Sequence, residues 1–445
     1  TKVTSKTAML MISGGSVDSE PSTEEAALLV PFAEGANTVV ALLDTVPNEP
    51  LTFADETRTR TEDAIIAYSY DKYITGFNEG DPDKTWPLLL PMARSAVRAM
   101  DTVQDFMNAK PSQPRTISKF VVAGASKRGW TTWLTAASDS RVSAIVPIVI
   151  DVLSMENQMD HHKRAYSGYA EADWDKYGIH GGYSKAIADY VDKKVFQRFG
   201  TPASASLLRI VDPFTYRNVL TMPKLIANST GDQFFLPDSS QFYFDQLPGD
   251  NHIYYAPNTD HGLSSSLGLG VDTGTVNSIK AFYFAHVRNT NDIASDDVAV
   301  PHFTWDFTVD NNAKKAYVQV NSDTVPSSVK LWKAVNASYR DFRLGIIGAA
   351  WTSTILKSQC ATLCAAEGEA DKAVDCGCAT DPAGKIFDGV VDIPDTGWCG
   401  FFVQLTYPGF QVQSTTASGA VQTEQIDFSF STSIKVVPEV YPDEK

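Results

Sequence analysis

Apolar residues in the first third of the chain gather into short runs that alternate with longer amphipathic stretches. The runs Ala36–Leu43, Phe120–Ala123 and Val142–Val149 are rich in Val, Ala and Ile, and we expect each to form a strand. Thr57–Thr75 and Leu89–Asn108 repeat their apolar residues at helical spacing. Strands that alternate with helices in this way predict βαβ units and a parallel sheet.

This pattern breaks twice further along. Residues 153–217 are rich in aromatic, glycine and charged residues and predict a helical lid insertion. Residues 218–290 return to the first pattern and end in an amphipathic helix, Val276–Val287. From 291 to 445, short alternating runs between turn residues predict a small β-sandwich. Its expected strands are Phe303–Val309, Ala316–Val320, Val329–Ala334, Phe401–Tyr407 and Phe428–Val437. We therefore expect an α/β core in two parts, 1–152 and 218–290, followed by an all-β domain.

A serine follows one of the predicted strands directly, in Gly124-Ala125-Ser126. A helix-like segment begins at the next residue. This is the setting in which a sharp turn exposes a nucleophilic serine at the end of an α/β-hydrolase sheet. The second glycine of the usual pattern is displaced by one position, because Arg128 precedes Gly129. The alternative is a buried serine in an ordinary strand-to-helix turn.

An acid and a histidine follow in the order that this fold uses, Ser, Asp, His. Asp232 ends one predicted strand and His261 lies in the loop after another. His261 would take the proton from Ser126, and Asp232 would hold the imidazole. Asp238 and Asp260 are competing acids, although Asp238 is also suited to capping a helix that begins at the next residue. Asp260 is adjacent to His261, so we expect its side chain to point away.

Backbone N–H groups must stabilise the oxyanion that this chemistry forms. One is expected from Lys127, the residue after the nucleophile. The other is expected from Gly14-Gly15, which follow an apolar strand near the start of the chain. An ordinary tight turn is the alternative for these glycines.

Several blocks of sequence resemble the PhoPQ-activated pathogenicity-related family, which includes the autocrine proliferation repressor proteins. The blocks are Val46–Leu51, Thr85–Met92, Ala99–Asp101, Gly124–Trp133 and Gly231–Asp238. The resemblance implies an α/β-hydrolase fold. Family members usually carry further strands before the segment that matches Thr1. Either processing has removed these strands, or the sequence is partial, or a second chain or another protein partner supplies them. The elbow is also similar to that of glucuronoyl esterases, whose Arg after the serine helps to hold the oxyanion. Lys127 stands at that position, either with the same role or as a solvated side chain.

Charge and composition exclude several classes of partner. The net charge of −16 argues against nucleic acid and against an anionic membrane surface. No apolar run approaches the roughly 20 residues of a membrane span.

His161, His162 and Trp174 in the insertion are candidates for a substrate pocket, or for the insertion's own core. Adjacent histidines on a helix point in different directions, so we expect no metal there. His180 and His302 stand in no motif. We expect no cofactor.

The cysteines lie close together, at Cys360, Cys364, Cys376, Cys378 and Cys399. Two disulfides and a thiol are expected, which would place the protein outside the cytoplasm. A zinc site is the alternative, but one residue between Cys376 and Cys378 is fewer than zinc pairs usually have. Asn336 begins a glycosylation sequon, which is consistent with secretion.

The sequence as a whole predicts a serine hydrolase. We expect it to cleave a carboxylic ester of a small molecule or a polymer through an acyl-enzyme. A secreted signalling or binding protein on a hydrolase scaffold, and a carbohydrate-directed esterase, are the alternatives.

Overall fold

The centre of the molecule is a six-stranded sheet in which every neighbouring pair of strands is parallel. The computed structural model describes residues 5–20, 22–110, 116–264, 271–289, 299–360, 383–415 and 421–444. In sheet order the strands are β10 (Asn251–Ala256), β9 (Lys224–Ser229), β6 (Val142–Ile148), β5 (Lys119–Ala125), β1 (Thr7–Ile12) and β2 (Val39–Leu43). The predicted parallel α/β sheet is thus confirmed.

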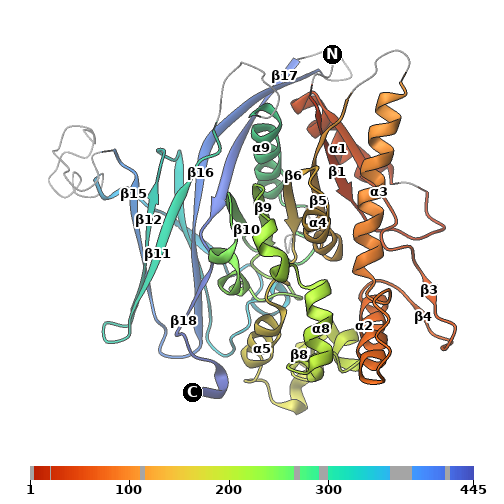
Figure 1. Ribbon diagram of the computed structural model, residues 1–445. Helices are drawn as coiled ribbons and strands as arrows, with labels where there is room; N and C mark the ends of the chain where they lie inside the picture. Colours follow the sequence, from red (N-terminus) through yellow and green to blue (C-terminus); the bar gives the residue numbers. More distant parts are fainter. Residues whose placement is uncertain are drawn as a thin grey trace.

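Helices cover both faces of this sheet (Figure 1). On one face lie α3 (Leu89–Asn108) and α4 (Lys127–Ser138), and on the other α1 (Thr23–Ala36) and α9 (Thr273–Asn289). The strand residues alternate between the two faces. Leu10 packs in one apolar cluster with Trp133 of α4, whereas Met9 packs in another with Phe282 of α9. The sheet therefore separates two large apolar cores.

The insertion between β6 and β9 is mostly helical and packs against α2 (Asp63–Asn78). Its α-helices are α5 (Met155–Ala165), α6 (Trp174–Tyr177), α7 (Ala188–Asp192) and α8 (Pro202–Val211). A short hairpin, β7 (Ile179–His180) and β8 (Tyr183–Ser184), lies between α6 and α7.

Two antiparallel sheets form the C-terminal domain, as the alternating pattern predicts. One sheet has the order β11 (Phe303–Asp310), β12 (Lys315–Ser322), β15 (Ile386–Asp392). The other has the order β14 (Thr352–Ile355), β13 (Ser328–Asn336), β16 (Trp398–Thr415), β17 (Val421–Ser431), with β18 (Lys435–Val437) also paired to β16. Phe284 of α9 contacts Phe410 of β16 edge to face, with ring centroids 6.0 Å apart. The domain therefore shares a core with the α9 face of the parallel sheet.

Some predicted elements have different bounds in the structure. The helix expected from Thr57 begins only at Asp63, because Thr59–Arg60 forms a strand, β4, that pairs with β3 (Leu51–Thr52). The strand expected over Phe428–Val437 is interrupted after Ser431 and resumes at Lys435. Helix α1, which the apolar pattern did not reveal, begins after Ser22, whose side chain accepts a hydrogen bond from the N–H of Glu25.

The expected covalent modifications receive little support. Cys360 and Cys399 are both buried and are not bonded to each other, and Cys364, Cys376 and Cys378 lie outside the described residues. Glycosylation at Asn336 stays a prediction that the structure disfavours, since the residue is only 9% exposed and its side chain donates a hydrogen bond to the carbonyl of Asp341 at 2.7 Å. No helix within the described ranges is long and apolar enough to cross a membrane.

Strand β5 and helix α4 approach each other closely where the chain turns between them. A Cβ atom on Gly124 would lie 2.6 Å from the carbonyl oxygen of Arg128, and one on Gly129 would lie 2.8 Å from the carbonyl oxygen of Gly124. Both contacts are with backbone, which cannot rotate away. The displaced second glycine thus provides the close approach that the usual spacing would provide.

Gly124→Ala should therefore destabilise the protein by about 1–3 kcal/mol, because overpacking forces the backbone to shift. The matched control is Gly345→Ala in α10 (Leu344–Ile347), where an added Cβ has no atom within 4 Å. Denaturant unfolding measures both. Equal unfolding free energies for the two variants would contradict the packing argument.

Candidate active site

Ser126 adopts a backbone conformation that few residues other than glycine tolerate. Its φ is 56° and its ψ is −129°. Its N–H donates to the carbonyl of Ile148 at 2.8 Å, and its own carbonyl accepts from the N–H of Trp130 at 3.0 Å. These bonds fix the turn between β5 and α4, and with it the position of the side chain at the carboxyl end of the sheet. Such a strained turn is characteristic of a nucleophile elbow.

The structure brings Ser126, His261 and Asp232 together in one chain of hydrogen bonds. Nε2 of His261 lies 2.9 Å from Oγ of Ser126, and Nδ1 lies 2.8 Å and 3.0 Å from the two oxygens of Asp232. The Asp232 carboxylate is nearly buried and also accepts the N–H of Phe234 at 2.7 Å. The ring of Phe234 lies against His261 with centroids 4.2 Å apart. The imidazole is thus held by a carboxylate on one side and an aromatic ring on its face.

The two competing acids are engaged elsewhere. Asp238 does not cap the following helical turn with its side chain; it is buried and binds His161 at 2.9 Å and Arg340 at 2.5 Å. Oδ1 of Asp260 accepts the N–H groups of Gly262 and Ser264, at 3.0 and 3.1 Å. The side chain of Asp260 therefore shapes the loop of His261 instead of reaching its ring.

The two expected sources of oxyanion donors lie beside the serine. Lys127 is the first residue of α4, where backbone N–H groups have no partner within the helix. Ile12 at the end of β1 pairs in register with Gly124, which places the following loop next to the elbow. Gly14 lines a cavity together with Ser126 and His261. Gly15 has a φ of 134°, which favours glycine.

The two cations of the elbow, Lys127 and Arg128, are buried and pair with carboxylates at the start of α2. The side chain of Lys127 is 6% exposed and binds Glu62 and Asp63. Arg128 makes two parallel hydrogen bonds to Glu62, at 2.8 and 3.1 Å. Burial opposes the ionisation of Glu62, but Arg128 and the charge of Lys127 lower its pKa to about 2. Lys127 is therefore not the solvated side chain that was one alternative.

A mostly apolar cavity of about 40 Å³ opens beside Ser126. Besides Ser126 and Lys127, it is lined by Asp63, Trp130, Ile150, Val152, Met155, Met159, Ile187, Tyr190, Phe196, Phe234 and Phe235. Sequence analysis did not identify these residues as a pocket. A partial signal was present, because Phe234 and Phe235 follow the acid closely and Trp130 lies in the first turns of the elbow helix.

The aromatic residues predicted for the pocket lie elsewhere. His161, His162 and Trp174 are absent from the described residues that line the cavity beside Ser126. His161 is buried between Asp238 and the hydroxyl of Tyr441, and His162 packs on Tyr166. Trp174 belongs to a small satellite cluster of the insertion. These contacts favour the insertion's own core over a substrate pocket as the role of the three side chains.

Solved structures with a similar fold include several hydrolases. Est1E from Butyrivibrio proteoclasticus is 14% identical, with 63% of this chain and 88% of that chain covered and a TM-score of 0.32. An acetyl xylan esterase from Paenibacillus sp. R4 is 14% identical, with 58% of this chain and 70% of that chain covered and a TM-score of 0.36.

Comparisons of sequence identify the family. Autocrine proliferation repressor protein A of Dictyostelium discoideum is 30% identical over 454 residues, which cover 99% of this chain and 79% of that protein. Residues 1–343 match the model of the PhoPQ-activated pathogenicity-related protein family. The chain, with its α/β-hydrolase fold, therefore belongs to the PhoPQ-activated pathogenicity-related protein family.

Proposed function

We propose that this protein is a serine hydrolase that cleaves carboxylic esters through an acyl-enzyme. The observation that carries the proposal is the continuous hydrogen-bond chain from Asp232 through His261 to Oγ of Ser126. A carboxylate on one imidazole nitrogen and a serine hydroxyl on the other is the arrangement that activates serine as a nucleophile.

In the proposed reaction, Oγ of Ser126 attacks the ester carbonyl while Nε2 of His261 takes its proton. The N–H of Lys127 and the Gly14-Gly15 loop supply the positive dipoles for the oxyanion. His261 then returns the proton to the leaving alcohol, and the acyl group remains on Ser126. Water, deprotonated by His261, releases the acid in the second half of the cycle.

The cavity beside Ser126 supports a short, apolar acyl group. A volume of about 40 Å³ corresponds to roughly three water-sized groups. Its lining is rich in aliphatic and aromatic side chains, which favours an alkyl chain of about three or four carbons over a sugar.

A binding function is the second candidate, because the Dictyostelium relative is named a repressor of proliferation and is similar over nearly the whole chain. The Ser126→Ala protein separates the two candidates. An effect on cell proliferation that survives this substitution would be independent of hydrolysis.

Replacing Asp232 with Asn should lower kcat for p-nitrophenyl butyrate by roughly 10⁴-fold, because an amide cannot hold the imidazole in the required tautomer. Ser126→Ala should abolish both turnover and labelling by a fluorophosphonate. Asp260→Asn is the control, since its oxygen serves only backbone N–H groups of the loop. Labelling of Ser126→Ala as strong as that of the wild type would refute the assignment of the nucleophile.

Activity on p-nitrophenyl esters should peak near butyrate and fall for octanoate, which exceeds the cavity. Val152→Phe narrows the cavity and should shift the optimum towards acetate. The butyrate-to-acetate ratio of kcat/KM should fall roughly tenfold, because the binding free energy of about two buried methylene groups is lost. Val325→Phe, at an exposed position of the C-terminal domain, is the matched control for added bulk away from the site. An unchanged chain-length profile in Val152→Phe would place the acyl group elsewhere.

A further inference from the structure

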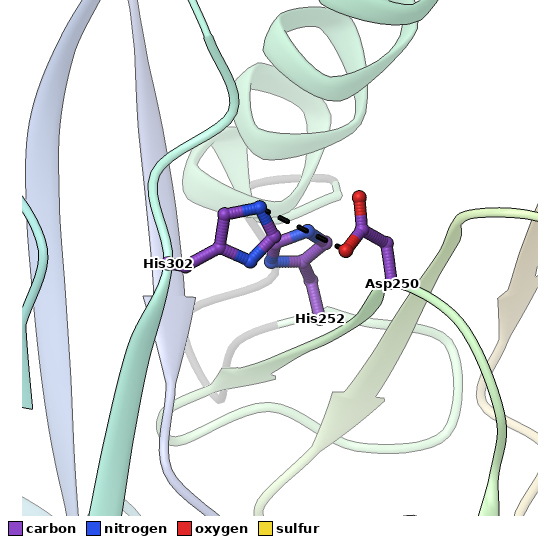
Figure 2. Close-up of side chains that lie close together, drawn as sticks. All are labelled: Asp250, His252 and His302. Atoms are coloured by element: carbon purple, nitrogen blue, oxygen red, sulfur yellow. Dashed lines mark ion pairs between the residues drawn. The ribbon is translucent and has the colours of Figure 1, made fainter.

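A second cluster of polar side chains lies where the parallel sheet meets the C-terminal β-sandwich. Asp250 directly precedes β10, His252 is in β10, and His302 directly precedes β11. One ligand atom from each residue lies within 4.8 Å of the other two. Figure 2 shows the carboxylate and both imidazole rings facing one another. None of these residues belongs to the site around Ser126.

His252 contributes a buried nitrogen that has no hydrogen-bond partner among the described residues. The side chain is only 5% exposed, and its ring stacks on Phe430 of β17 with centroids 4.5 Å apart. A buried polar atom of this kind costs free energy unless something binds it.

The side chains of Asp250 and His302 lie too far apart to form a hydrogen bond with each other. Nε2 of His302 lies 3.8 Å from Oδ1 of Asp250, beyond hydrogen-bond range. The surface pair His180 and Asp192, by contrast, is closed at 2.7 Å. The wider gap leaves room for an ion between the carboxylate and the rings.

We propose that Asp250, His252 and His302 bind a divalent transition metal, with Zn²⁺ as the ion that best fits two imidazoles and one carboxylate. Metal bonds of 2.0–2.2 Å in a tetrahedron place the ligand atoms about 3.4 Å apart. His252 is fixed by its stacking, whereas the side chains of Asp250 and His302 are about half exposed and can close the remaining distance. Their exposure leaves the fourth position to water.

Lys224, a cation whose charge acts on both Asp250 and His252, is bonded to other groups. Nζ of Lys224 donates to the carbonyls of Met222 and Pro248, at 2.8 and 2.7 Å. The Asp250 carboxylate is outside this set of bonds and stays available. A bound ion would tie the edge strand β10 to the start of β11, and so fasten the C-terminal domain to the hydrolase core.

The test uses the full chain after dialysis against a chelator, with Zn²⁺ as the probe. Calorimetric titration should give about one site per chain, and saturating zinc should raise the Tm by roughly 5 °C. His302→Gln and Asp250→Asn change half-exposed residues and should fold, yet bind zinc at least roughly tenfold more weakly and lose the Tm shift. His180→Gln, which alters a closed surface pair, should behave as the wild type.

Binding to Co²⁺ identifies the ligand type and excludes the cysteines as the source of affinity. Coordination by Asp250, His252 and His302 should give a visible spectrum without a thiolate charge-transfer band. A thiolate band, wild-type affinity in His302→Gln, or no binding by the wild type would each overturn the proposal. Because none of these readouts uses hydrolysis, the outcome is independent of the role of Ser126.

Discussion

The left-handed backbone of Ser126 is the constraint on which the rest of the site depends. A turn this sharp brings α4 against β5 so closely that only glycine fits at positions 124 and 129. It also directs Arg128 under the loop of Gly14, where a Cβ on the glycine would lie 2.6 Å from a guanidinium nitrogen. The elbow and the loop that faces it are therefore shaped by the same side chain, and neither is free to move without the other.

Hydrogen bonds between charged side chains stabilise the strained turn at Ser126. Arg128 binds Glu62 through two hydrogen bonds and also donates to the carbonyl of Val46, so it joins α4 to the loop that follows β2 and to the residue that precedes α2. Two parallel bonds between guanidinium and carboxylate are strong and directional, and they offset the cost of burying the charge of Arg128. The carboxylates of Glu62 and Asp63 also retain Lys127, which keeps an ammonium beside an otherwise apolar cavity.

The parts of this site that were predictable from sequence are those encoded locally. Ser126, Asp232 and His261 each follow a recognisable strand, and parallel strands bring their carboxyl ends to one edge of the sheet. The sequence left the role of His161 open between a substrate pocket and the insertion's core, because its partners, Asp238 and Tyr441, lie 77 and 280 residues further along the chain. Local pattern carries no information on such contacts. The cluster of Asp250, His252 and His302 could not be predicted either. His302 lies 50 residues after His252 and comes close to it only in the folded protein, where the C-terminal domain packs on the parallel sheet.

The C-terminal domain also contacts the loops that carry Asp232 and His261. The carbonyl of Gly231, next to Asp232, accepts the N–H of Leu344, and the side chain of Asn258 exchanges two hydrogen bonds of 2.9 Å with the backbone of Trp351. Both loops that present the acid and the histidine are thus held by residues beyond the parallel sheet. On the neighbouring strand, Tyr255 donates its N–H to Oγ of Ser431 in β17. Since β10 is an edge strand that would otherwise be open, the C-terminal domain both covers that edge and positions the two loops. The β-sandwich is therefore part of the scaffold of the candidate active site, because hydrogen bonds that hold the loops of Asp232 and His261 cross from one domain to the other.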